Sequence, residues 1–240
     1  MVSELATRLP DLPRWVETRG MLLSGRCDLI VPPEPGAADA VVRGTDFGLF
    51  CVSGDPPLEA LPAALARHGG RAVLCAGGRS EELSTILSGW TRSRAVIHAL
   101  AGEEPSGPRV GQAGVRVAML SGRDAGALSH VPDRLREELS TALGCSHVAA
   151  AFVEDLPVAF CYASYETETL WDLSIDTLEG YRRRGLARAS SEFLIGHMAR
   201  HGKRPVWGAL DSNAPSIRMA ASLGFVPVDT LTVFAPPEAA

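Results

Sequence analysis

The sequence predicts an α/β protein in two parts, a smaller N-terminal domain over residues 1–110 and a second domain over residues 111–240. Three observations support this prediction. Short apolar runs alternate with segments of helical periodicity along the chain. A segment rich in proline, glycine and acid, Ala101 to Pro108, interrupts that pattern and marks a boundary. In the second part, a strand, a basic turn with a glycine and a helix follow one another directly.

The composition is that of an ordinary globular protein, and its charge limits the partners that we expect. The formal net charge of −5 argues against nucleic-acid binding by charge alone. Arginine replaces lysine everywhere except at Lys203, which we interpret as the coding bias of a GC-rich, bacterial genome. No stretch is long enough to cross a membrane, so we expect no membrane partner.

The cysteines and the N-terminus predict a reduced, cytoplasmic protein. The five cysteines are far apart, and no C-x-x-C or Cys/His spacing suggests a metal site, so reduced core thiols and no metal are expected. The first residues lack a basic segment followed by an apolar one, and we therefore expect no secretion signal. A homodimer is compatible with these features.

In the first part, period-2 apolar runs predict strands and helical spacing predicts helices. The expected strands are 28–31, 49–52, 71–75 and 94–100, and the expected helices are 58–67 and 81–87. No convincing ligand motif occurs here. We expect this part to pack against the second and wall one side of an acceptor cleft, and a role in folding or dimerisation only is the open alternative.

The second part opens with a strand at 115–120 and a helix at 132–143, and then becomes rich in strands. A short Glu154-Asp155-Leu156 connection predicts a hairpin between two of them. The expected later elements are strands 147–152, 157–165, 171–177, 205–210 and 226–234, a helix that starts at Leu186 and a helix at Asn213.

The turn Tyr181 to Ala187 has the features of an anion site. Small residues at Gly185 and Ala187 leave backbone N–H groups accessible where the following helix begins, and the helix dipole favours negative charge there. Phosphate is the expected guest. A solvated basic patch is the alternative interpretation, and neither a P-loop nor a G-x-G-x-x-G motif follows a strand.

Arg182-x-x-Gly185-x-Ala187 resembles the R/Q-x-x-G-x-G/A signature of the GNAT acyltransferase superfamily. A second block, from Trp207 to Phe225, resembles that superfamily's strand, its N-x-x-[AS] helix start and its closing L-G-F. The resemblance covers about residues 113–240. It implies a mixed, mostly antiparallel sheet with flanking helices, which binds acetyl-CoA or a related acyl-CoA and transfers the acyl group directly to an amine.

The resemblance also implies where coenzyme A binds. Asp176, Thr177 and Leu178 match the positions whose backbone pairs with the pantetheine arm. The pyrophosphate cradle matches a run of six residues: Arg182, Arg183, Arg184, Gly185, Leu186 and Ala187. Asn213 and Ser216 match the N-x-x-[AS] pair beside the cofactor, and Asn213 is equally a candidate N-cap.

The catalytic residues are less clearly marked. The superfamily often has a tyrosine seven residues after this asparagine, which protonates the leaving thiolate, and here that position is Ala220. Water or a hydroxyl such as Ser216 could replace it. Glu166, Glu168 and Asp172 are candidate bases, and we rank Asp172 first because it lies within the central strand.

Two functions are consistent with this sequence. The first, which we rank higher, is an N-acyltransferase that moves acetyl from acetyl-CoA, or the acyl group of a close relative, to a small-molecule amine. The second is an acyl-CoA-binding protein with weak or no amine acetylation, serving as a sensor, a structural partner or an enzyme of other thioester chemistry. The missing tyrosine favours the second, and the acceptor itself is not specified by these motifs.

Overall fold

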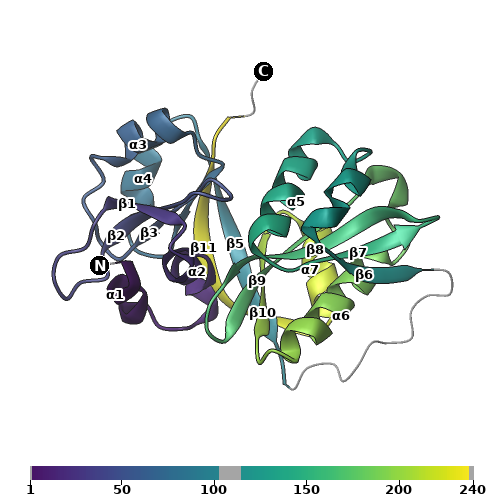
Figure 1. Ribbon diagram of the computed structural model, residues 1–240. Helices are drawn as coiled ribbons and strands as arrows, with labels where there is room; N and C mark the ends of the chain where they lie inside the picture. The colour runs from purple at the N-terminus through teal and green to yellow at the C-terminus, as the bar shows by residue number, and fades with distance from the viewer. Residues whose placement is uncertain (1, 103–114, 238–240) are drawn as a thin grey trace.

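The computed structural model describes residues 2–102 and 115–237. Eleven strands of these residues form one sheet in the order β1-β2-β3-β4-β11-β5-β10-β9-β8-β7-β6 (Figure 1). Most neighbours are antiparallel, and β3–β4 and β9–β10 are the parallel pairs of the described sheet. The predicted mixed, mostly antiparallel sheet with flanking helices is therefore confirmed.

The elements have the following bounds. The strands are β1 Cys27–Val31, β2 Ala40–Gly44, β3 Leu49–Ser53, β4 Ala72–Cys75, β5 Thr91–Leu100, β6 Arg116–Leu120, β7 Val148–Val153, β8 Leu156–Glu166, β9 Leu170–Thr177, β10 Arg204–Leu210 and β11 Phe225–Ala235. The α-helices are α1 Val2–Arg8, α2 Val16–Ser24, α3 Leu61–His68, α4 Ser80–Ile86, α5 Asp133–Cys145, α6 Leu186–Ala199 and α7 Ala214–Ser222. Short 3-10 turns are η1 Pro13–Trp15, η2 Gly122–Leu128 and η3 Glu179–Tyr181.

The two halves of the chain repeat one order of elements. The succession β3-α3-β4-α4-β5 matches β9-α6-β10-α7-β11, and the first two strands of each succession are parallel. The last strands are exchanged: β5 pairs with β10 of the other half, and β11 pairs with β4. Because β5 and β11 also pair with each other, antiparallel, at the centre of the sheet, the halves are related by a local two-fold arrangement.

The exchange of β5 and β11 affects how the chain can be divided into domains. Strand β5 precedes the predicted linker but lies between β10 and β11, so the downstream half completes its sheet with an upstream strand. Most of the linker lies outside the described residues. Whether residues 1–110 and 111–240 fold separately stays a prediction.

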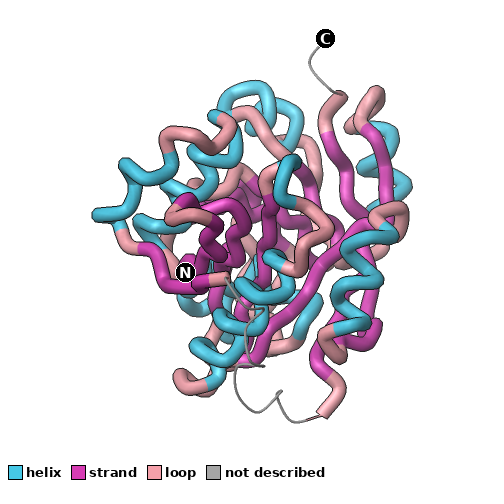
Figure 2. Tube along the Cα trace, turned by 90° about the vertical axis from the view of Figure 1, so that its right-hand side faces the viewer, coloured by secondary structure: helices cyan, strands magenta, loops and turns pink. Residues whose placement is uncertain are grey.

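Helices cover both faces of the sheet, as Figure 2 shows from the side. Helices α1, α2 and α5 cover one face, and their core draws residues from both halves, among them Leu5, Met21 and Leu139. On the other face, α3 and α4 pack on the upstream strands, while α6 and α7 pack on the downstream ones. The large core on the first face therefore joins the two halves.

Several elements were not predicted from the sequence, namely α1, α2, β2 and the 3-10 turns η1, η2 and η3. Helix α2 is the informative case, because it contains Gly20, a residue that lowers helix propensity. A Cβ atom added at Gly20 would lie 2.8 Å from Cβ of Tyr165, so the glycine allows close packing of α2 on β8. The predicted β7–β8 hairpin is confirmed, with Glu154 and Asp155 in left-handed conformations at φ 49° and 64°.

Candidate active site

The central feature of the site is a wedge between the parallel strands β9 and β10. They pair at only three positions, the last being Val206 with Asp172. Beyond that point β10 continues along β5, while β9 continues along β8. The β10-facing edge of β9 from Leu173 to Thr177 has no strand partner among the described residues.

The predicted pyrophosphate turn lies at the wide end of the wedge, directly after β9. Arg183 and Gly185 have left-handed backbones, at φ 60° and 74°, and Gly185 is the N-cap of α6. Within the described ranges, no backbone carbonyl accepts from the N–H groups of residues 183–188. Buried Leu186 holds the first turn of α6 against β7 and β8. The turn thus presents a row of free amides at a helix N-terminus, which suits an anion.

The three arginines of the turn have different environments. Arg182 donates from Nε to the carbonyl of Thr177 at 3.2 Å and so links the turn to the end of β9. The guanidinium of Arg184 lies 5.5 Å from the ring centre of Tyr181. Arg183 is exposed. The remaining cradle residue, Ala187, belongs to the first turn of α6.

The corresponding turn of the upstream half, between β3 and α3, lacks this chemistry. Pro56 and Pro57 have no N–H group, and Asp55 and Glu59 bring negative charge. The N–H of Leu61 already donates to Leu58. Of the two repeated turns, only the downstream one suits an anion.

Asn213 and Ser216 lie at the start of α7, just after β10. Since β9 and β10 are parallel, this helix start and the pyrophosphate turn share one edge of the sheet. Asn213 Oδ1 accepts from the backbone N–H of Ser216 at 3.2 Å, so the N-cap interpretation is confirmed. Ser216 Oγ accepts from Nε1 of buried Trp207 at 3.0 Å.

The three predicted pantetheine positions differ in what their backbone offers. Asp176 and Thr177 lie on the unpaired edge of β9, although the Thr177 carbonyl accepts from Arg182. Leu178 is already engaged, because its N–H donates to Val158 and its carbonyl accepts from Tyr181, both at 2.9 Å. In this structure the N–H of Leu178 is therefore not free for a ligand, since the chain there continues the β8 ladder.

Asp172 lines a cavity of about 210 Å³ inside the wedge, together with Glu17 from the first turn of α2. Apolar side chains, glycine and one serine complete the wall: Leu74, Ala95, Ile97, Leu173, Ser174, Gly208, Ala209, Leu210 and Leu231. Burial raises the pKa of both carboxyl groups, and the charge of Asp172 raises the pKa of Glu17 further. Only the Ser164 hydroxyl acts to lower the pKa of Asp172.

Sequence reasoning did not find Glu17. It lies in a short helix of weak amphipathic pattern, more than 150 positions before Asp172 in the chain. No motif in the sequence marks it. Only the packing of α2 over β8 and β9 brings it to the wedge.

A second acidic group lies further along the same face of β9. The Tyr162 hydroxyl donates to Asp176 at 3.4 Å and to Glu138 of α5 at 3.2 Å. Burial, and then the charge of Glu138, raise the pKa of Asp176 to about 6. Asp172, Ser174 and Asp176 alternate along β9, so their side chains share one face.

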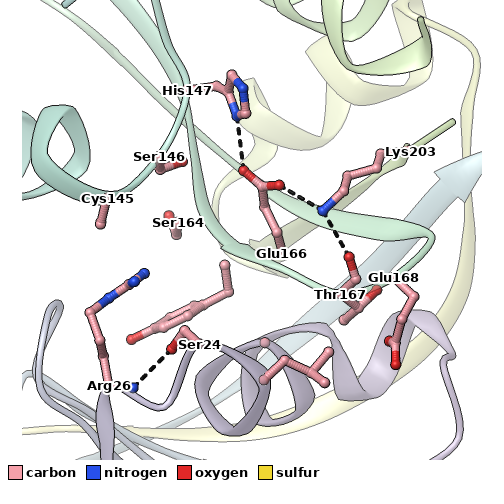
Figure 3. A pocket seen from close by; sticks show the side chains of 13 residues that line it. Ser24, Arg26, Cys145, Ser146, His147, Ser164, Glu166, Thr167, Glu168 and Lys203 are labelled. Carbon is pink, nitrogen blue, oxygen red and sulfur yellow. Dashed lines mark hydrogen bonds and ion pairs between the residues drawn. The ribbon is translucent and has the colours of Figure 1, made fainter. Parts of the chain in front are cut away.

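The other two candidate bases, Glu166 and Glu168, lie beside a larger cavity of about 480 Å³ at the β8–β9 turn (Figure 3). Glu166 accepts from Lys203 at 2.7 Å and from His147 at 3.0 Å. Burial acts to raise the pKa of Glu166, but these bonds hold it below its usual value. Glu168 accepts two bonds from Arg19, at 2.8 and 2.6 Å, which lower its pKa. Both are ion-paired, and this end of β9 is the one where β9 and β10 remain paired, so we place the chemistry in the smaller cavity.

Ala220, at the usual tyrosine position, is fully buried in the apolar core between α7 and the sheet. The cavity that holds Glu17 and Asp172 does not include it. In residues 2–102 and 115–237, no group of three or more His, Cys, Asp or Glu side chains is arranged to hold a metal ion. None of the helices described is both long and apolar enough to cross a membrane.

Comparison with solved structures extends the fold over the whole chain. A GCN5-related N-acetyltransferase-like protein from Streptococcus suis is similar with a TM-score of 0.76 and 16% identity, covering 98% of this chain and 99% of that one. A GCN5-related N-acetyltransferase from Kribbella flavida is similar with a TM-score of 0.63 and 15% identity, covering 100% of this chain and 96% of that one. A tandem GNAT protein from the clavulanic acid biosynthesis pathway is similar with a TM-score of 0.56 and 13% identity, covering 91% of this chain and 86% of that one. No curated protein matches the sequence.

The wedge between parallel strands and the amide turn at its open end, together with these likenesses, define a protein with the GNAT acetyltransferase fold. The family model of GNAT acetyltransferases matches residues 148–234, which contain the wedge, the turn and the Asn213 helix. The chain therefore carries a GNAT superfamily region at residues 148–234, within its C-terminal half.

Proposed function

We propose that the protein is an acyl-CoA-dependent N-acyltransferase, which transfers acetyl from acetyl-CoA to the amine of a small molecule by direct attack. One observation carries the proposal: the wedge between β9 and β10 has free amides at its open end and a carboxyl-lined cavity within it. The first feature suits a diphosphate, and the second suits an amine.

Coenzyme A fits the residues of the wedge. Its pyrophosphate would accept from the amides of residues 183–188, and the exposed Arg183 would add positive charge. The pantetheine arm would lie along the unpaired edge of β9 between Leu173 and Thr177, upstream of the engaged Leu178. Asn213 and Ser216 would support the arm by fixing the start of α7.

The acceptor side of the wedge is acidic, so a cationic amine is the acceptor that it favours. Glu17 and Asp172 line the cavity, and no lysine, arginine or histidine does. Asp172 is the proposed base, since its raised pKa makes it a better proton acceptor than an ordinary aspartate. The 210 Å³ cavity limits the reacting end to a small group.

The second candidate is an acyl-CoA-binding protein with little or no amine acetylation. The observation in its favour is Ala220, which has no proton to donate and is buried in an apolar core. The free amides of the turn support coenzyme A binding under either function.

Two measurements on the full chain separate these functions. Calorimetry with coenzyme A is expected to give one site per chain, because only the downstream turn suits a diphosphate. Thiol release from acetyl-CoA is then measured with a panel of small primary amines. Amine-dependent release with formation of the amide supports the transferase, whereas binding without release at any amine supports the binding protein. Failure to bind coenzyme A would contradict both.

A further inference from the structure

The cavity in the wedge is walled by two acids from opposite ends of the chain. Glu17 reaches it from α2, and Asp172 belongs to β9. Among the described residues, neither carboxyl group forms an ion pair, and the polar side chain that acts on Asp172 is the Ser164 hydroxyl, which also bonds Ser174 at 2.6 Å. Nearby cations are used elsewhere: Arg14 pairs with Asp229, and Arg19 pairs with Glu168.

The remaining titratable groups that face this pair are neutral. Cys51 of β3 and Tyr165 of β8 both have their pKa raised, first by burial and also by the charges of Glu17 and Asp172. Apolar side chains surround the two half-buried carboxyl groups and no cation lines the cavity, so a second negative charge is disfavoured there. This environment favours a pair that shares one proton.

We propose that Glu17 and Asp172 act together as the acid and base of acyl transfer, with Asp172 accepting the proton of the amine and Glu17 protonating the leaving thiolate. This inference rests on the proposed function. It gives the upstream half a catalytic residue, and it supplies the acid that Ala220 cannot provide.

The assignment of roles follows from the fold. Asp172 lies in the last paired position of β9 and β10, where the wedge begins to open toward the acyl end of the cofactor. Glu17 lies across the cavity on α2. The charge of Asp172 raises the pKa of Glu17, and this direction favours the protonated form of Glu17.

The proposed steps balance. The ammonium of the acceptor gives one proton to the Asp172 carboxylate, and the free amine attacks the thioester carbonyl to form the C–N bond. The C–S bond breaks, and the thiolate takes the proton of Glu17. The amide nitrogen then gives its surplus proton to the Glu17 carboxylate, and Asp172 releases its proton to solvent. The products are the amide, free coenzyme A and one proton.

The first test needs no acceptor. Infrared difference spectra at pH 7 compare the full-length protein with Glu17→Gln and Asp172→Asn, and the exposed Glu59→Gln serves as matched control. The C=O stretch of a protonated carboxyl is expected in the wild type and in the control, and it should be absent from Glu17→Gln. A wild-type spectrum without this band would overturn the shared proton.

The second test is the pH dependence of transfer to an amine that the wild type uses. Glu17→Gln and Asp172→Asn should each lower kcat by about 10²- to 10⁴-fold, while the affinity for coenzyme A stays unchanged. Asp172→Asn should lose the acidic limb of the pH–rate profile, and Glu17→Gln should lose the alkaline limb. A Glu17→Gln protein with wild-type kcat and profile would overturn the role of Glu17 but leave the proposed function intact. A wild type that acetylates no amine would instead contradict the proposed function.

Discussion

Replacing Leu100 by alanine tests whether the two halves of the chain unfold together. Leu100 ends β5, before the predicted linker, yet its side chain is 7% exposed and belongs to the core of the downstream half. It pairs in register with Phe225 of β11, and that ring packs edge-on against Trp207 with 5.4 Å between centroids. Truncation therefore leaves a cavity beside two large aromatic side chains.

The expected loss is large for one substitution. Leucine to alanine in a closed core costs about 2–5 kcal/mol, and domains of this kind have a net stability of about 5–15 kcal/mol. Because β5 is shared between β10 and β11, we expect one unfolding transition that moves as a whole. The control is Leu12→Ala, at a leucine that is 50% exposed, which should change the free energy of unfolding by less than about 0.5 kcal/mol.

Urea unfolding followed by tryptophan fluorescence and by far-ultraviolet circular dichroism measures both variants. The two signals should coincide, and their common midpoint should fall in Leu100→Ala alone. Two separate transitions, with only one shifted, would show that the halves are independent and that the exchanged strand does not couple them. An unchanged midpoint would show that Leu100 is not part of the downstream core.

Four further predictions concern the site. Gly185→Glu should weaken coenzyme A binding by several kcal/mol, because a residue with a left-handed backbone gains a side chain, and because that side chain is negatively charged like the phosphates. If calorimetry finds unchanged affinity in a folded variant, this turn does not bind the pyrophosphate. Asn213→Ala should lower stability by about 1 kcal/mol through loss of its cap, and a melting temperature equal to wild type would argue against that cap. Ala220→Tyr should lower stability by about 1–3 kcal/mol and should not raise turnover, because the residue is fully buried; faster turnover in thiol-release assays would show that the ring reaches the thiolate. Folding raises the pKa of Asp176 from 3.8 to about 6, so its protonated carboxyl stabilises the folded protein below about pH 4, and this stabilisation is lost as the pH rises through about 6. The melting temperature of the wild type, relative to that of Asp176→Asn, should therefore fall over that pH range. A difference in melting temperature that stays constant with pH would contradict the raised pKa.

Much of the fold was predictable because local patterns decided it. The strands of the second half alternate apolar and polar residues or form apolar runs, and the turn at Gly185 requires a left-handed backbone that glycine adopts without strain. Helix α2 was missed for the opposite reason. Its Gly20 serves contact with Tyr165, and a residue chosen for close packing carries no helical signal of its own.

The residues of the candidate site were likewise predictable only where local geometry decides their position. The Arg182 to Ala187 turn and the Asn213 cap depend on backbone geometry within a few residues, so a short motif marks them. Leu178 was predicted to offer its backbone to the cofactor, but strand β8, which no local motif places there, already uses its N–H. The base ranked first, Asp172, lies in the wedge as a candidate. The competing Glu166 and Glu168 are instead ion-paired with Lys203 and with Arg19.

By itself, the sequence determined the order of strands and helices in the second half, the anion-binding turn and the superfamily of that half. These features follow from interactions between residues close in the chain. Only the tertiary structure decided that β5 and β11 are exchanged and that Glu17 faces Asp172. Both depend on which distant surfaces pack together, and that choice is made by the burial of the whole sheet and not by any local pattern.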